Sequence, residues 1–183
     1  MKQVAKRLYL VVVEVSSYIY SGRIFSVKTA EHTLPSGRKA SVDFVEHPGA
    51  VAILPVLDRD NIVLVKQYRP VIRSWIYEVP AGTLVSGESP YGCAVRELRE
   101  ETGFSAGHLV KMFEMYMAPG YSTELLHGYL AEGLKKGEAR LEKDEELTVE
   151  VIPLKRAEEM INRNEIRDSK TIATILYYVK YGG

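Results

Sequence analysis

Gly82-Thr-Leu-Val-Ser-Gly-Glu88 leads into the acidic stretch Arg96-Glu97-Leu98-Arg99-Glu100-Glu101-Thr102-Gly103-Phe104, and the residues around the junction predict a helix. Ser89 is a favourable N-cap, and Pro90 suits the first helical position because that position needs no N–H. Gly103 suits the left-handed residue that ends a helix. We therefore predict a helix from Pro90 to Thr102 that follows a glycine-containing loop.

Three glutamates gather on one side of this predicted helix. At about 100° per residue, Glu97, Glu100 and Glu101 share a face beside an apolar stripe made of Tyr91, Ala94, Val95, Leu98 and Thr102. Acids three or four residues apart repel by roughly 0.2–0.5 kcal/mol per pair, which weakens the bare helix. Arg96 and Arg99 fall on other faces, so hard cations such as Mg²⁺ are the expected source of compensating charge. A solvated acidic surface is the alternative interpretation.

The complete pattern resembles the signature of the Nudix hydrolase family at every fixed position, with Gly82, Glu88, Arg96-Glu97-Leu98, Glu100-Glu101 and Gly103-Phe104. The resemblance implies an α/β (α+β) fold, a layered α/β/α sandwich with a mixed sheet. We accordingly divide the chain into an N-terminal β-sheet extension, residues 1–48, and a Nudix hydrolase domain, residues 49–183.

The same resemblance implies roles for individual residues. Glu97 and Glu101 are the expected principal metal ligands, with Glu100 and the carbonyl of Ala81 assisting. Arg96 is expected to orient a ligand glutamate, and Glu88 to anchor the loop at the substrate side of the site.

Composition fits one domain with an appendage. The chain has 183 residues, 46% of them hydrophobic, which suffices to bury a core. Lysine plus arginine and aspartate plus glutamate each total 24, so the whole chain shows no electrostatic footprint for nucleic acid or an anionic membrane. Cys93 is the only cysteine, and the apolar run at 8–13 is too short to span a bilayer. We expect a cytoplasmic protein.

Periodicity and turn signals predict an N-terminal antiparallel sheet. Residues that favour strands cluster near 8–15, 23–33 and 38–47, and Pro35-Ser36-Gly37 supplies a turn between the last two segments.

The rest of the chain reads as mixed strands and helices. Residues 50–57 and 62–68 flank Asp58-Arg-Asp-Asn61 as a second hairpin, and 75–79 leads as a strand into the motif loop. Further strands are predicted at 109–117, 125–131 and 147–154, followed by helices near 155–162 and 169–181.

Segments outside the signature narrow the resemblance to the ADP-ribose pyrophosphatase group. They are His47-Pro-Gly-Ala-Val-Ala-Ile53, Gln67-Tyr-Arg-Pro70, Glu78-Val-Pro-Ala-Gly82 and Ala118-Pro-Gly-Tyr-Ser-Thr-Glu-Leu-Leu-His127. Pro119, Gly120 and Glu124 lie in the segment that resembles the group's substrate loop, although Glu124 also fits a solvated loop acid. Arg69 suits a phosphate through its planar fork of donors, with a surface charge as the alternative.

The acidic run Glu142-Lys-Asp-Glu-Glu146 precedes the predicted strand at 147–154. By composition alone it is a solvated connection. The resemblance implies a mobile loop whose glutamate acts as general base or completes the metal shell when substrate closes it. We assign this role first to Glu145 and then to Glu146.

The expected reaction is hydrolysis of the pyrophosphate bond of ADP-ribose to AMP and ribose 5-phosphate, with Mg²⁺, or Mn²⁺ as a substitute, activating water. The resemblance also implies a homodimer in which the N-terminal sheet packs on the partner and lends residues to the adenine pocket. The alternative is hydrolysis of another nucleoside diphosphate derivative, such as GDP-mannose or another nucleotide sugar, FAD or NADH. A non-catalytic ADP-ribose-binding regulatory domain is less favoured, because every motif glutamate is present.

Overall fold

The computed structural model describes residues 13–141 and 145–182, and the chain forms two compact units. The first unit comprises residues up to His47 together with Ala118–Thr123, and the second comprises Pro48–Met117 and the chain from Glu124 onward. The predicted division after residue 48 stays a prediction. The structure adds to it that Ala118–Thr123, distant in sequence, groups with the N-terminal sheet.

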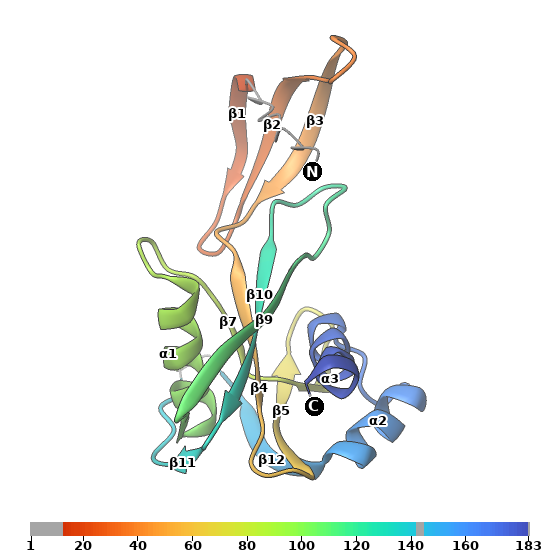
Figure 1. The fold of residues 1–183 in the computed structure, drawn as a ribbon. Coiled ribbons are helices and arrows are strands. Elements are labelled where there is room, and N and C mark those ends of the chain that lie inside the picture. The colour runs from red at the N-terminus through yellow and green to blue at the C-terminus, as the bar shows by residue number, and fades with distance from the viewer. Residues whose placement is uncertain (1–12, 142–144, 183) are drawn as a thin grey trace, which may run out of the picture. The chain divides into compact units, whose positions relative to one another are not determined.

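The first unit is built on an antiparallel sheet in the order β1-β2-β3, with strands β1 (Val13–Ser21), β2 (Ser26–Thr33) and β3 (Lys39–Glu46) (Figure 1). The turn predicted between the last two is present, closed by Leu34 N donating to Arg38 O at 2.8 Å. The strand predicted near 8–15 lies mostly outside the described residues. Its predicted end was wrong, because β1 continues to Ser21 and stays paired with β2 despite two register shifts.

The segment Ala118–Thr123 attaches to the last strand of this sheet. Val45 N donates to Tyr121 O at 2.8 Å, and Thr123 N donates to Val45 O at 3.0 Å. The Thr123 hydroxyl also accepts from His47 N at 3.0 Å. These bonds explain why the loop belongs to the first unit.

The two larger sheets of the second unit share a core. The four-stranded sheet has the order β7 (Ala81–Thr83), β4 (Ala50–Pro55), β10 (Leu125–Glu132), β9 (His108–Tyr116). Its β4 and β10 are parallel and its other pairs antiparallel. The three-stranded antiparallel sheet has the order β12 (Leu147–Pro153), β5 (Asn61–Arg69), β6 (Ser74–Glu78). The short strands β8 (Phe104–Ser105) and β11 (Lys135–Lys136) also pair.

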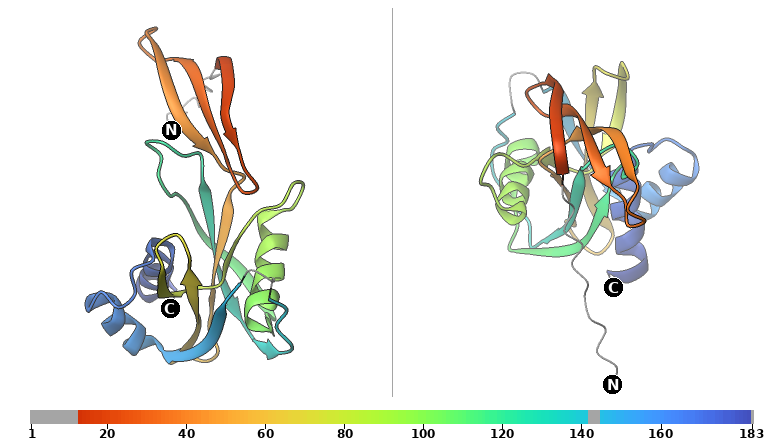
Figure 2. Two further views of the ribbon diagram at one scale, coloured as in Figure 1. Left: turned by 180° about the vertical axis from the view of Figure 1, so that it is seen from behind. Right: turned by 90° about the horizontal axis from the view of Figure 1, so that it is seen from above.

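Helices cover both sides of these sheets. Helix α1 (Pro90–Thr102) lies on one side, and α2 (Leu154–Asn162) and α3 (Ser169–Tyr181) lie on the other (Figures 1 and 2). Alternate residues of β4 point to opposite cores: Val51 and Ile53 pack with residues of α1, whereas Ala52 and Leu54 pack with residues of α2 and α3. The mixed α/β/α fold is confirmed. Among the described residues, no helix is long and apolar enough to cross a membrane.

The predicted hairpin around Asp58 was wrong in its pairing. The turn itself forms, with the Asp58 carboxylate accepting from the N–H groups of Asp60 and Asn61, both at 2.9 Å. The flanking strands, β4 and β5, then enter different sheets instead of pairing with each other. Next to the turn, Val56 and Ile62 form an isolated bridge. Both strands are apolar on two faces, so each is buried between neighbours of its own.

Candidate active site

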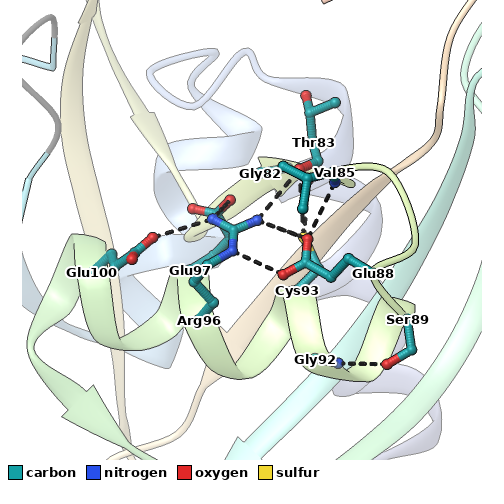
Figure 3. Close-up of polar contacts among 10 residues, drawn as sticks. All are labelled: Gly82, Thr83, Val85, Glu88, Ser89, Gly92, Cys93, Arg96, Glu97 and Glu100. Atoms are coloured by element: carbon teal, nitrogen blue, oxygen red, sulfur yellow. Dashed lines mark hydrogen bonds and ion pairs between the residues drawn. The ribbon is translucent and has the colours of Figure 1, made fainter.

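Helix α1 has the boundaries that its capping residues predict. The Ser89 hydroxyl accepts from Gly92 N at 3.1 Å (Figure 3). Pro90 occupies the first turn, and Gly103 ends the helix with φ 73°. This φ lies in the left-handed region that favours glycine. The helix is thereby fixed at both ends next to the loop that connects it to β7.

The buried face of α1 differs from the predicted apolar stripe. Tyr91 and Val95 are about half exposed, whereas Cys93 is fully buried and Glu97 and Glu101 are 8% and 3% exposed. The helix is rotated so that Cys93, Ala94 and Leu98 face the sheet and carry the two glutamates inward with them. The physical reason is steric: small side chains allow close approach to β4, and Tyr91 instead packs edge-on against Tyr129.

Arg96 lies at the centre of the polar cluster that Figure 3 draws, and its predicted placement on a face away from the acids was wrong. Its Nε and Nη2 donate to the two oxygens of Glu88, both at 2.9 Å. Its Nη1 donates to Glu97 at 2.6 Å and to Glu100 at 3.1 Å. The long side chain folds back over the helix. Its guanidinium therefore supplies part of the positive charge that was expected to come from a metal ion.

Glu88 closes the motif loop onto this guanidinium. Its carboxylate also accepts from Val85 N at 3.2 Å, so the loop returns on itself just before the helix starts. The hydrogen bonds from Arg96 hold the pKa of Glu88 at about 2, well below its ordinary value. Glu88 is therefore an ionised anchor whose oxygens are already occupied.

Two buried carboxylates face the opposite electrostatic situation. Burial raises the pKa of Glu97 to about 7, with the charges of Glu100 and Glu145 acting in the same direction and Arg96 opposing them. Burial and the charge of Glu97 hold the pKa of Glu101 well above its ordinary value, although Ala81 N donates to its Oε2 at 3.1 Å. Burial is therefore the main reason why both carboxyl groups have raised pKa values.

Gly82 gives the Glu97 carboxylate its space. A Cβ at residue 82 would lie 1.8 Å from Glu97 Oε1 and 2.0 Å from Glu97 Cδ, far inside van der Waals contact. The close approach of the β7 backbone to this carboxylate explains why glycine stands here.

The charge of Glu145 raises the pKa of both Glu97 and Glu101, which brings part of the acidic run at 142–146 within electrostatic reach of the motif acids. Glu146 is exposed and its main-chain oxygen accepts from Tyr68 N at 2.9 Å. Residues 142–144 lie outside the described part of the chain. Of the two candidates for the general base, Glu145 is the one whose charge acts on the pKa values of the motif glutamates.

The acids fit a hard cation in their chemistry, because carboxylate oxygens are the ligands that Mg²⁺-type ions prefer. Within residues 13–141 and 145–182, no three acidic, histidine or cysteine side chains converge as a ligand set. Arg96 holds Glu97 and Glu100 instead, and Glu101 is bonded to the Ala81 main chain.

The candidate substrate residues fall in both units. Arg69, at the end of β5, donates from Nε and Nη2 to the two oxygens of Glu78 at 2.6 and 2.7 Å. These hydrogen bonds raise the pKa of Arg69, and the charge of Glu101 acts in the same direction. Glu124 belongs to the second unit, whereas Pro119 and Gly120 belong to the first.

Pro119 and Gly120 line a hollow within the first unit, with a volume of about 200 Å³. Its other lining residues are His32, Val42, Phe44, Tyr121, Ser122 and Thr123. The rings of His32 and Phe44 lie 6.1 Å apart at 58°, so the hollow has an aromatic wall beside a loop.

Two charged residues that the sequence argument left without a role are central to the second unit. Glu78 is 1% exposed, and Lys170, on α3, contacts its Oε2. The sequence contains no signal for this pair, because the two residues are 92 positions apart. Cys93 has no such role: burial raises the pKa of its thiol to about 12, which leaves it unreactive.

Comparison with known proteins agrees with this geometry. Residues 46–175 match the family described as NUDIX domain. The chain is 40% identical over 161 residues to "ADP-ribose pyrophosphatase" of Bacillus subtilis (strain 168), covering 87% of each chain. It is 37% identical over 161 residues to "Methanol dehydrogenase activator" of Bacillus methanolicus, again covering 87% of each.

A solved structure gives the same result for the fold. The crystal structure titled "ADP compounds hydrolase" superposes with a TM-score of 0.79 at 22% sequence identity, covering 97% of this chain and 96% of that one. The matched domain includes α1, its preceding loop and the strands that hold Arg69 and Glu78. This chain therefore belongs to the Nudix hydrolase family.

Proposed function

We propose that the protein hydrolyses the pyrophosphate bond of ADP-ribose, giving AMP and ribose 5-phosphate, with Mg²⁺ as the metal ion and Mn²⁺ as a substitute. The observation that carries the proposal is a pair of buried carboxylates, Glu97 and Glu101, on the motif helix. The charge of Glu145 acts on the pKa of both groups, and the charge of Arg69 acts on the pKa of Glu101. The name of the Bacillus subtilis relative supports ADP-ribose as the substrate.

A diphosphate resists attack by water because its oxygens are negative, so catalysis needs neutralising charge, an activated water and fixed geometry. Glu97, Glu101, Glu100 and the Ala81 carbonyl are the oxygens proposed to hold the metal. When bound, a divalent ion supplies charge neutralisation and lowers the pKa of water. Arg96, fixed by both oxygens of Glu88, keeps the Glu97 carboxylate oriented.

Glu145 is the proposed general base. Its charge raises the pKa of both buried motif acids, so the carboxylate is electrostatically coupled to the proposed metal site. In its ionised form, the Glu145 carboxylate would accept the proton of the attacking water.

Binding of the adenosine part is proposed for the first unit. The hollow beside Pro119 and Gly120 has an aromatic wall, and a flat base buries well against aromatic surfaces. We further propose a cytoplasmic homodimer formed through the N-terminal sheet. Exposed apolar side chains of that sheet, including Tyr18, Ile19 and Tyr20, support a contact surface.

The test is incubation of purified protein and Mg²⁺ with ADP-ribose, GDP-mannose, other nucleotide sugars, FAD and NADH, with products identified by mass. We expect AMP and ribose 5-phosphate to form fastest, and chelation of the metal to stop the reaction. Faster cleavage of another compound would move the substrate to that compound. Wild-type turnover by Glu97→Gln or Glu101→Gln would contradict the metal assignment, and binding of ADP-ribose without cleavage would favour a regulatory domain.

A further inference from the structure

A chain of charges centred on a buried carboxylate connects the candidate phosphate-binding arginine to the start of α3. Arg69 binds Glu78 with a fork-to-fork pair of hydrogen bonds at 2.6 and 2.7 Å. Lys170 contacts the same Glu78 carboxylate from the first turn of α3. One carboxylate thus lies between two cations.

Glu78 has no freedom to turn away from either cation. Its side chain is 1% exposed, and burial of its charge is opposed by the hydrogen bonds of Arg69 and the charge of Lys170, which leave its pKa below the ordinary value. An ionised group this deep is retained only when well paired.

Lys170 is itself held from the helix side. Its Nζ lies 2.9 Å from Asp168, which caps α3 by accepting from Thr171 N at 3.0 Å. The Thr171 hydroxyl donates to Asp168 and accepts from Val79 N at 2.8 Å, next to Glu78 in the chain. The N-terminus of α3 is therefore joined to the end of β6 in two ways. One is the ion pair between Lys170 and Glu78, and the other is the hydrogen bond from the main-chain N–H of Val79 to Thr171.

The ion pair with Glu78 orients the Arg69 guanidinium but leaves some of its N–H groups available. Two of its five N–H groups bind Glu78, and its side chain is 40% exposed, so the remaining donors can bind a diphosphate. A guanidinium already fixed in direction loses less rotational freedom when a phosphate binds.

We propose that Glu78 is the positioning residue for Arg69, and that Lys170 keeps Glu78 in place, so that the start of α3 controls binding of the substrate diphosphate. This inference rests on the proposed function, in which Arg69 contacts the diphosphate. Neither Glu78 nor Lys170 touches the reacting atoms.

The experiment measures kcat and KM for Lys170→Met alone and in an Arg69→Ala background. The substrate is whichever nucleoside diphosphate derivative the wild-type protein hydrolyses fastest, so a wrong choice of ADP-ribose overturns only the substrate. Lys170→Met should raise KM roughly 10-fold with kcat within about 2-fold, because binding alone is lost. With Arg69 absent it should add less than about 2-fold.

Lys170→Arg keeps the charge and should restore KM, while Lys180→Met removes a lysine from the exposed end of the same helix and should change nothing. Should Lys170→Met fail to fold, Lys170→Gln keeps a hydrogen-bond donor without the charge and gives the same comparison. An unchanged KM, or equal effects of the lysine substitution with and without Arg69, would overturn the proposal. A wild-type protein that hydrolyses none of the compounds would overturn the proposed function and this inference together.

Discussion

Replacing Gly82 by alanine should disable the enzyme while leaving it folded. The added Cβ would lie 1.8 Å from Glu97 Oε1, whereas ordinary contact begins near 3.4 Å, so the carboxylate must move by at least the difference, 3.4 − 1.8 = 1.6 Å. The Glu97 side chain has to move from Cγ outward, because the new Cβ would also lie 2.6 Å from its Cγ. Arg96 and the buried surroundings hold the Glu97 carboxylate in its present place. In the variant, the whole carboxylate must therefore take a different position.

The magnitudes separate activity from stability. A misplacement of about 1 Å at a catalytic group costs on the order of 100-fold in rate, so turnover should fall by at least that factor. Overpacking costs about 1–3 kcal/mol, and replacing glycine within a strand returns roughly 0.5–1 kcal/mol. At about 2–4 °C per kcal/mol, the Tm should fall by less than about 10 °C.

The assay is turnover of ADP-ribose at saturating Mg²⁺, together with thermal unfolding followed by circular dichroism. Gly92→Ala is the matched control, since residue 92 lies in α1 with its nearest neighbour, Ser89 Oγ, at 3.2 Å from the new Cβ. The control should keep full turnover, and its stability should change by no more than about 1 kcal/mol, because the helix preference of alanine is opposed by the close contact with Ser89 Oγ. Wild-type turnover in Gly82→Ala would refute the reasoning, and so would loss of the fold, because the structure requires displacement of only one side chain.

Three further variants have expected outcomes. Glu145→Gln should lower kcat for ADP-ribose by roughly 10²–10⁴-fold with little change in binding, as for loss of a general base. Glu146→Gln should stay near the wild-type rate, and the reverse order of effects would transfer the role to Glu146. Gly128→Ala should destabilise the fold by about 1–3 kcal/mol, since its Cβ would lie 2.5 Å from Phe113 Cζ. An unchanged urea midpoint would show that the Phe113 ring can move aside.

Local signals in the sequence predicted the local structure correctly. Ser89, Pro90 and Gly103 act within one or two turns of the chain, and they set both ends of α1 correctly. The strands around β4 and β5 were also placed to within a few residues, because apolar runs and turns mark them. The pairing of those two strands was not predictable, since adjacency in sequence favours a hairpin and only the other strands decide where each one is buried.

Within the site, residue types were predicted better than their contacts. Helical periodicity gathered the glutamates correctly, but it assigned Arg96 to another face, because periodicity describes Cβ directions and ignores the reach of a long side chain. Periodicity also predicted that Tyr91 and Val95 would be buried, whereas the structure buries Cys93 and Glu97. A rotation of the helix by a fraction of a turn produces this difference, and the sheet beneath it determines that rotation.

The sequence by itself determined the acidic helix, its caps, the glycine-containing loop and the family signature, since these depend on residues close together in the chain. Only the tertiary structure decided that Glu97 and Glu101 are buried, that Arg96 binds three glutamates, and that Glu78 lies between Arg69 and Lys170. The physical reason is that burial and charge pairing are set by neighbours in space, and the partners of Glu78 come from a neighbouring strand and from a helix 92 residues away.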